Sequence, residues 1–282
     1  MKTKLLNIKG ELLSLKKPVV MGILNVTPDS FFPDSRQANE SEVIQRIETI
    51  RSEEGTWIDV GGYSTRPDAL DVSMEDEWQR LEPTLQILMK QYPEMRVSVD
   101  TFRADIAKRA VEDYDVAIIN DISGGSRDEK MFETVAELNV PYVLTHYFDK
   151  PQNVCANTVG KPITEDVMLY FAEKLQLLRV LGVKDVIIDP GFGFGKTLDQ
   201  NYELLKNLNH FPLLFECPLC VGISRKRMIY NLLGCSVDES LNGTTVLNAY
   251  ALLNGADLLR VHDVKAAVEA VKLIDKLIQL SR

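Results

Sequence analysis

Eight short runs of apolar, mostly β-branched residues recur along this chain, and each is followed by a longer segment with helical spacing. The runs are Val19–Val26, Thr56–Gly61, Arg96–Thr101, Val116–Ile122, Tyr142–His146, Val186–Asp189, Leu219–Ile223 and Leu258–Val261. The helical segments are Glu42–Glu53, Met74–Lys90, Ala104–Glu112, Lys130–Leu138, Glu165–Leu181, Gln200–Leu208, Thr244–Leu253 and Val264–Leu280. Eight such units predict an α/β fold with a closed parallel sheet, the (β/α)8 TIM barrel.

The same alternation fits a doubly wound open sheet, but eight regular units without an obvious second domain favour closure. The chain has 282 residues, a length at which α/β barrels often form a single domain. We therefore predict a barrel over 18–282 and an N-terminal extension over 1–17, in which Leu5–Leu15 is a candidate hairpin.

Composition narrows the classes of function. The chain has 32 Lys and Arg against 41 Asp and Glu, a net charge of −9, which argues against broad nucleic-acid binding. No apolar run reaches the roughly 18 to 20 residues of a membrane span, and the segment 1–10 is too polar for a signal peptide, so a cytoplasmic location is expected. Four cysteines are too few for a disulfide framework, and Cys217 and Cys220 lack the further ligands of a zinc site.

Polar or glycine-rich sequence ends seven of the eight apolar runs, immediately before the next helical segment. These ends are Asn25-Val-Thr-Pro-Asp, Gly61-Gly-Tyr-Ser-Thr-Arg, Asp100-Thr, Asn120-Asp, Asp189-Pro-Gly, Ser224-Arg-Lys and Arg260-Val-His-Asp. In a barrel they meet at the carboxyl face, where the active sites of this fold lie. We therefore expect these polar residues to form one site.

The acidic candidates at or near these ends are Asp59, Asp100, Asp121, Asp189 and Asp263. The ordinary role of one aspartate there is to cap the next helix or fix a turn. Asp100, Asp189 and Asn120 differ, because each ends an apolar strand at the barrel mouth, where a partly buried carboxylate needs hydrogen-bond donors. A heterocycle with a guanidine-like N–H edge and a ring amide meets that need, and a pterin has this pattern.

The basic candidates are Arg66, Lys226, Arg260 and His262, which follow the second, seventh and eighth runs. Each one alone is accounted for as a solvated surface charge. A barrel brings all four to one rim of an acidic protein, so we interpret them as a clamp for an anionic substrate group.

A phosphate-loop interpretation arises for the segment Asp189-Pro-Gly-Phe-Gly-Phe-Gly-Lys-Thr197, which ends in Gly-Lys-Thr between a strand and a helix. The first required glycine is replaced by Pro190, which has a fixed φ and no N–H. Because such loops bind phosphate through backbone N–H groups, the sequence argues against ATP binding here.

The segment Met21-Gly-Ile-Leu-Asn-Val-Thr-Pro-Asp-Ser-Phe31 closely resembles the opening signature of the dihydropteroate synthases. Further segments resemble the remaining motifs of that family in order: Asp59-Val-Gly-Gly-Tyr-Ser-Thr-Arg-Pro67, Ser98-Val-Asp-Thr101, Ile119-Asn-Asp121, Asp189-Pro-Gly-Phe-Gly-Phe-Gly-Lys196, Gly222-Ile-Ser-Arg-Lys226 and Arg260-Val-His-Asp263. The resemblance implies a folate-biosynthesis enzyme, the target of sulfonamides, that joins a dihydropterin pyrophosphate to p-aminobenzoate and releases pyrophosphate.

Carried over residue by residue, the resemblance surrounds the pterin ring with Asp100, Asn120, Asp189 and Lys226, and Gly222 leaves room beside it. The diphosphate would be held by Arg66, Arg260 and His262, with hydroxyl contacts from Ser64 and Thr65. Asn25 would ligate a Mg²⁺ ion carried by the pyrophosphate.

The p-aminobenzoate pocket implied by the resemblance is bordered by Pro67, Phe194 and Lys226. Catalysis would be electrostatic, without a covalent nucleophile, and would be carried by Asp100, Asp189, Lys226, Arg260 and His262. Members of the family are commonly homodimers, for which Thr244–Leu253 and Val264–Leu280 are candidate surfaces.

Two alternatives stay open, and local departures from the family pattern prompt the second of them, the weak paralogue. Tyr63 stands where the family usually has Glu, Thr145-His-Tyr147 replaces Met-His-Met, and Arg227 replaces a small serine, while Phe32-Pro33 lengthens the first loop. One alternative is a pterin-binding methyltransferase domain, which has no pyrophosphate to hold. The other is a catalytically weak paralogue that binds pterin.

Overall fold

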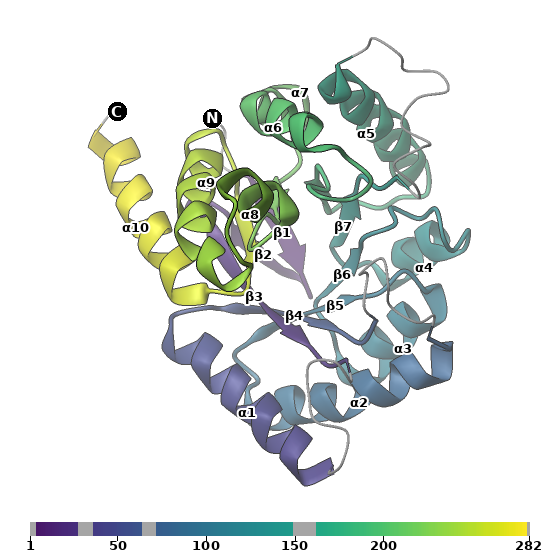
Figure 1. Ribbon diagram of the computed structural model, residues 1–282. Coiled ribbons are helices and arrows are strands. Elements are labelled where there is room, and N and C mark those ends of the chain that lie inside the picture. The colour runs from purple at the N-terminus through teal and green to yellow at the C-terminus, as the bar shows by residue number, and fades with distance from the viewer. Residues whose placement is uncertain (1–3, 28–35, 64–71, 149–161, 281–282) are drawn as a thin grey trace.

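A computed structural model describes residues 4–27, 36–63, 72–148 and 162–280, the side chains of 36–39 excepted. Its centre is a sheet of eight strands surrounded by helices (Figure 1). In chain order the strands are β3 (Val19–Asn25), β4 (Trp57–Gly61), β5 (Arg96–Asp100), β6 (Ile118–Asp121), β7 (Tyr142–Thr145), β8 (Val186–Asp189), β9 (Cys220–Val221) and β10 (Leu258–Val261). All eight predicted strands are confirmed.

The sheet is parallel throughout and closes on itself. Neighbouring strands follow the order β8, β7, β6, β5, β4, β3, β10, β9. A parallel bridge between Ile188 and Leu219 joins the two outer strands, and the Ile188 N–H donates to the Pro218 carbonyl at 2.9 Å. The predicted (β/α)8 barrel is confirmed, and the alternative of an open, doubly wound sheet is ruled out.

Among the described residues, one α-helix follows each barrel strand except β8 and β9, each of which is followed by two, and the helices lie on the outside of the barrel (Figure 1). They are α1 (Arg36–Ser52), α2 (Met74–Gln91), α3 (Ala104–Tyr114), α4 (Met131–Leu138), α5 (Ile163–Val180), α6 (Leu198–Lys206), α7 (Phe211–Leu214), α8 (Arg227–Leu233), α9 (Leu241–Leu253) and α10 (Val264–Leu280). The sequence did not predict α7 and α8, because one turn and seven residues are too short to show helical periodicity.

Helix boundaries follow local capping chemistry. Ser73 Oγ accepts the Asp76 N–H at 3.1 Å at the start of α2, and the first turn carries three acidic residues. Thr197 and Gln200 form a reciprocal capping box at the start of α6, with distances of 3.2 and 2.8 Å. These caps fix where the loops at the carboxyl face end.

Side chains inside the barrel change from apolar to polar along each strand. Near the amino ends, one buried cluster includes Trp57, Ile118, Val143, Ile187 and Leu258. Because strand side chains alternate in direction, the next inward positions on these strands are Asp59, Asn120, Thr145, Asp189 and Arg260. A packed apolar lower half therefore supports a polar upper half at the carboxyl ends.

The N-terminal segment covers the opposite end of the barrel. β1 (Leu5–Ile8) and β2 (Glu11–Ser14) pair as an antiparallel hairpin, as the sequence predicted. Leu6 and Ile8 are buried in the same cluster as the lower barrel residues. The structure therefore seats the hairpin on the barrel rather than apart from it.

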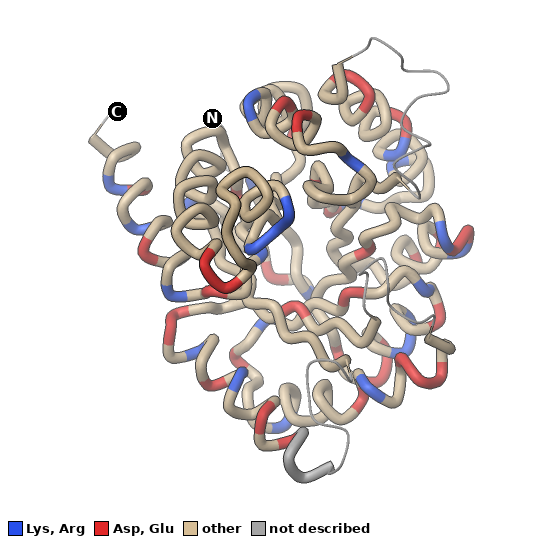
Figure 2. The backbone as a smooth tube through the Cα atoms, viewed as in Figure 1, with Lys and Arg blue, Asp and Glu red and all other residues tan. Residues whose placement is uncertain are grey.

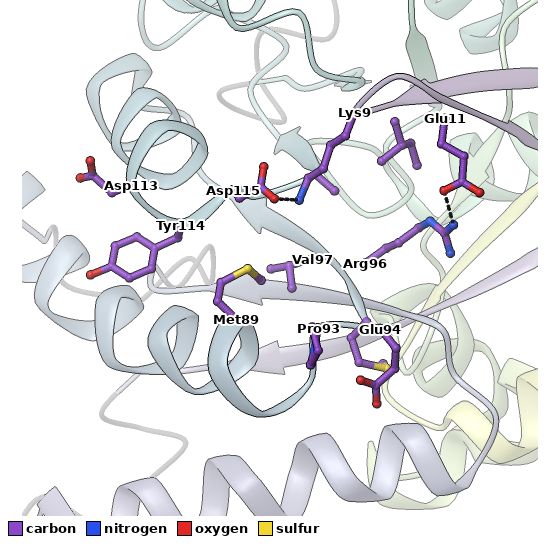
Figure 3. A pocket seen from close by; sticks show the side chains of 13 residues that line it. Lys9, Glu11, Met89, Pro93, Glu94, Arg96, Val97, Asp113, Tyr114 and Asp115 are labelled. Carbon is purple, nitrogen blue, oxygen red and sulfur yellow. Dashed lines mark hydrogen bonds and ion pairs between the residues drawn. The ribbon is translucent and has the colours of Figure 1, made fainter.

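A cavity of about 530 Å³ lies between this hairpin and the amino ends of β5 and β6 (Figure 3). Ion pairs between Lys9 and Asp115 and between Arg96 and Glu11 cross it. It lies at the amino end of the barrel, away from the polar half, so it is not the candidate site. No helix among the described residues has both the length and the apolar character needed to cross a membrane.

Candidate active site

Arg260 organises the acidic centre of the barrel. Its side chain starts on β10 and reaches across the interior, where Nε donates to Asp59 Oδ2 on β4 and Nη2 donates to Asp100 Oδ2 on β5, each at 2.6 Å. Asn120 Nδ2 on β6 donates to the same Asp59 oxygen at 2.9 Å. Four strands thus contribute to one hydrogen-bonded group, and the sequence-predicted residues Asp100, Asn120 and Arg260 lie together.

Burial sets the charge state of this group. Burial raises the pKa of Asp100 to about 7; Arg260 opposes that shift, while Asp59 and Glu77 add to it. Burial lowers the pKa of Arg260, but Asp59 and Asp100 outweigh it and hold this pKa above its ordinary value. The guanidinium is therefore always charged, whereas Asp100 takes up or loses a proton near neutral pH.

Asp189 faces the same interior space from β8. Its Oδ1 accepts the Gly191 N–H at 2.8 Å, and its Oδ2 would lie 3.6 Å from a Cβ added at Gly222. Burial raises the pKa of Asp189, and Lys226 and the Gly191 N–H oppose this shift. Gly222 thus leaves space between Asp189 and Arg260, as expected for a residue beside a flat ligand.

Lys226 lies at the start of α8 and reaches toward the loop after β8. Its Nζ donates to the Phe192 carbonyl and lies 4.4 Å from the centroid of the Phe194 ring. Burial lowers the pKa of Lys226 to about 8. The structure thus brings Lys226, Phe194 and Asp189 to one side of the polar interior, and their roles around the pterin and arylamine stay predictions.

The Gly-Lys-Thr segment is used within its own loop. Lys196 Nζ donates to the Gly191 carbonyl at 2.7 Å and lies 3.3 and 3.4 Å from the carbonyl oxygens of Phe194 and His146. Thr197 caps α6. Because these groups stabilise the loop itself, the geometry agrees with the sequence argument against an ATP-binding loop.

His262 follows β10 at the rim. Ser224 Oγ accepts its backbone N–H at 3.1 Å and lies 3.1 Å from its Nδ1, while Arg46 Nη2 on α1 donates to its carbonyl at 2.6 Å. Partial burial of the ring and the positive charge of Arg260 lower the pKa of His262. His262 as a whole remains partly accessible at the carboxyl face, and its imidazole is neutral at neutral pH.

Asn25, at the end of β3, is the predicted Mg²⁺ ligand. It pairs in register with Gly61, and a Cβ added at Gly61 would lie 3.4 Å from Asn25 Oδ1 and 3.6 Å from Asp100 Cβ. The described residues contain no cluster of three or more His, Cys, Asp or Glu suited to a metal. An exposed amide oxygen fits Mg²⁺ that keeps water and substrate phosphate as its other ligands.

Aromatic rings and guanidinium groups gather at the ends of β4, β5, β6 and β7. The Arg127 guanidinium lies 4.8, 5.7 and 6.0 Å from the ring centroids of Phe102, Tyr147 and Tyr63. The Tyr147 ring in turn lies 5.8 Å from that of Phe194. Tyr63 and Tyr147, two of the departures from the family pattern, therefore form an aromatic edge that continues into the predicted arylamine pocket.

The structure also places two more departures from the family pattern and one of the acidic candidates, Asp121. Thr145 is buried, and Arg227 is exposed. Asp121 accepts from the Ser123 and Gly125 N–H groups at 2.7 and 2.8 Å, which is the turn-fixing role expected of an ordinary aspartate. Figure 2 shows acidic and basic positions mixed along the outer helices.

Ser64, Thr65, Arg66 and Pro67 lie outside the described residues, so the structure neither supports nor contradicts their predicted roles. Asp59 and Arg46 are the contributors that sequence reasoning missed. The sequence indicated for Asp59 the ordinary role of capping a helix or fixing a turn. Its fully buried carboxylate instead orients Arg260 and Asn120. Its inward position two residues after Trp57 was the available signal.

Comparison with known proteins agrees with this geometry. The profile of the family described as "Pterin binding enzyme" matches residues 21–262. The dihydropteroate synthase of Escherichia coli (strain K12) is 37% identical over 269 residues, which are 95% of this chain and 94% of that protein. The chain belongs to the dihydropteroate synthase family.

Further members of the dihydropteroate synthase family match equally broadly. The enzyme of Streptococcus pyogenes serotype M6 is 37% identical over 262 residues, 92% of this chain and 95% of that one. The solved Xanthomonas albilineans dihydropteroate synthase with 4-aminobenzoic acid superposes with a TM-score of 0.87 at 32% identity and covers 98% of both chains. The same enzyme in complex with 7,8-dihydropteroate gives a TM-score of 0.84 at 31% identity, over 97% and 98% of the two chains.

Proposed function

We propose that this chain is a dihydropteroate synthase. It condenses 6-hydroxymethyl-7,8-dihydropterin pyrophosphate with p-aminobenzoate to give 7,8-dihydropteroate and pyrophosphate. The observation that carries the proposal is the group formed by Asp59, Asp100, Asn120 and Arg260, with Asp189 facing the same space, in a chain whose relatives share that activity along nearly their whole length. Related structures with 4-aminobenzoic acid and with 7,8-dihydropteroate support the same pair of substrates.

The carboxylates recognise the pterin. An ionised carboxylate only accepts hydrogen bonds, so Asp100 and Asp189 select a ring edge that presents N–H donors. Asn120 offers both a donor and an acceptor to a ring amide, and its orientation is set by Asp59. Because Arg260 already neutralises part of the acidic charge, the protein tolerates burial of these groups.

The reaction forms a C–N bond between the arylamine nitrogen and the pterin methylene carbon. The C–O bond to the pyrophosphate breaks, the leaving group keeps the electron pair, and the proton lost by the arylamine passes to the released pyrophosphate or to solvent. Two groups at the rim stabilise the departing negative charge: we assign this role to the N–H groups of the charged Arg260 that are not bonded to carboxylates, and to His262, whose neutral imidazole donates a hydrogen bond. Phe194 and Lys226 orient the arylamine.

Mg²⁺ is proposed as the cofactor. Asn25 is the described residue that would hold it at the end of β3, and the bound ion would neutralise pyrophosphate charge. This assignment uses the donor chemistry and position of Asn25 beside Gly61 and Asp100.

Turnover by the purified chain tests the function directly. Pyrophosphate release and dihydropteroate formation are measured with both organic substrates and Mg²⁺, and with each component omitted in turn. We expect release to require both substrates. Pterin binding without release would instead indicate the catalytically weak paralogue, and methyl transfer from a reduced folate would indicate the methyltransferase domain.

We also propose a homodimer and keep a cytoplasmic location as a prediction. Exposed apolar side chains lie on α9 and on the two helices that contact it, α8 and α10; they include Leu232, Leu233, Val246, Leu253 and Leu273. Such a face is what a subunit interface would cover. Light scattering after size-exclusion chromatography tests the oligomeric state.

A further inference from the structure

Two neighbouring loops at the rim are tied together twice. Arg225, in the loop after β9, makes a two-pronged ion pair with Asp263, in the loop after β10: Nε to Oδ2 and Nη2 to Oδ1 are both 2.8 Å. One residue earlier in each loop, Ser224 Oγ accepts the His262 N–H at 3.1 Å. The loop with Lys226 and the loop with His262 are therefore held in a fixed relation.

The Arg225 side chain uses each of its three guanidinium nitrogens in hydrogen bonds within the protein. Its Nη1 donates to the Val237 and Asp238 carbonyl oxygens at 3.1 and 3.0 Å, and its backbone N–H donates to Thr244 Oγ1 at 3.0 Å. Its φ of 53° lies in the left-handed region, where an L residue is held only if its surroundings compensate. Only 21% of its side chain is exposed, so Arg225 is not presented to a substrate.

We propose that Arg225 and Asp263 are positioning residues that hold the His262 segment in place for the pyrophosphate group. The inference rests on the proposed function, in which His262 contacts that group. A planar guanidinium bound through two parallel N–H groups resists rotation, so it fixes the adjacent His262 more tightly than a single contact would. Arg46 completes the support through the His262 carbonyl.

The ion pair between Arg225 and Asp263 is expected to affect binding of the pyrophosphate group and not of the pterin ring. Two of the residues predicted to surround the pterin, Asp100 and Asn120, are held separately by Arg260 and Asp59. Lys226 directly follows Arg225 in the chain, but its Nζ has its own anchor at the Phe192 carbonyl. Loosening the rim loops therefore weakens binding of pyrophosphate and leaves binding of a pterin without phosphates nearly unchanged. A general loss of structure would weaken both.

The test measures two affinities of the full chain by calorimetry: inorganic pyrophosphate with Mg²⁺, and 6-hydroxymethylpterin. Arg225→Lys keeps the positive charge and a non-glycine residue at the left-handed φ, but it loses the two-pronged geometry. Asp263→Asn removes the negative charge of the pair. We expect each variant to bind pyrophosphate about 10- to 100-fold more weakly, as misplaced contact groups do, and to bind the pterin within about twofold of the wild type. The double variant should lose little more than either single one.

A matched control uses the ion pair between Lys4 and Asp257, at 2.7 Å and with 10% and 16% of the side chains exposed, at the amino end of the same two strands. Asp257→Asn should reduce stability without changing either affinity. Wild-type protein that binds no pyrophosphate would contradict the proposed function. Wild-type binding with unchanged affinity in both rim variants, or an equal loss of pterin affinity, would overturn the positioning role alone.

Discussion

Replacement of Asp100 by asparagine separates ligand recognition from stability. Asp100 Oδ2 accepts from Arg260 at 2.6 Å and is predicted to face the N–H edge of the pterin. The substituted amide would offer one acceptor and an N–H₂ group directed at a donor. Losing one or two charge-assisted hydrogen bonds costs about 3 kcal/mol, or roughly 150-fold in the dissociation constant.

Stability should change little in the same variant. Burial already disfavours the charged form of Asp100, as its raised pKa shows, and Arg260 keeps its hydrogen bond to Asp59. We expect the free energy of unfolding to change by no more than about 1 kcal/mol. Titration with 6-hydroxymethylpterin gives the affinity, and urea unfolding gives the stability.

The pH dependence has a definite sign. The pKa of Asp100 is about 7 in the folded protein against 3.8 as its ordinary value, so its contribution to stability is greatest below pH 4 and is lost as pH rises toward 7. Ligand binding shows the opposite trend, because an N–H edge needs the ionised carboxylate. Below pH 7 the wild-type dissociation constant should rise about tenfold per pH unit from Asp100 alone, while that of Asp100→Asn should depend less steeply on pH, through Asp189 only.

Asp185→Asn is the matched control, because Asp185 accepts the Asn7 N–H at 2.9 Å at the amino end of the barrel. It should bind pterin as the wild type does at every pH. Wild-type pterin affinity in Asp100→Asn, or a large loss of its stability, would refute the assignment of Asp100 to the pterin pocket.

Three further outcomes are expected. Asp59→Asn should lower the free energy of unfolding by about 3 kcal/mol, since it breaks a buried pair, and an unchanged urea midpoint would contradict this. Gly191→Ala should lower the free energy of unfolding by more than about 2 kcal/mol, because the added Cβ would lie 1.9 Å from the His146 carbonyl oxygen. Gly182→Ala, which has open space around the added Cβ, should lower it by only about 1 kcal/mol, and thermal unfolding measures both. Asn25→Ala should raise the Mg²⁺ concentration for half-maximal turnover by about tenfold, and an unchanged Mg²⁺ titration would remove Asn25 from the metal site.

Local pattern carried much of the prediction. The eight strands were visible because β-branched apolar runs of four to eight residues bounded by glycine, proline and polar residues leave few other conformations. The position of Asp100, Asn120, Asp189 and Arg260 at strand ends then followed from closure of the barrel, which brings all such ends to one face. Helix α8 was not predicted, because its seven residues span only two turns and show no clear helical periodicity.

The partner of each polar group was decided only by tertiary structure. The sequence presents Arg260 as a rim cation, yet its guanidinium crosses the interior to Asp59 and Asp100, residues 201 and 160 positions away in the chain. Asp121 and Asp59 both lie on strands that end at the mouth, but one fixes a turn and the other orients Arg260 and Asn120. Periodicity determines which face a side chain occupies, because it depends on local geometry. Hydrogen-bond partners, burial and the resulting pKa depend on strands brought together by folding.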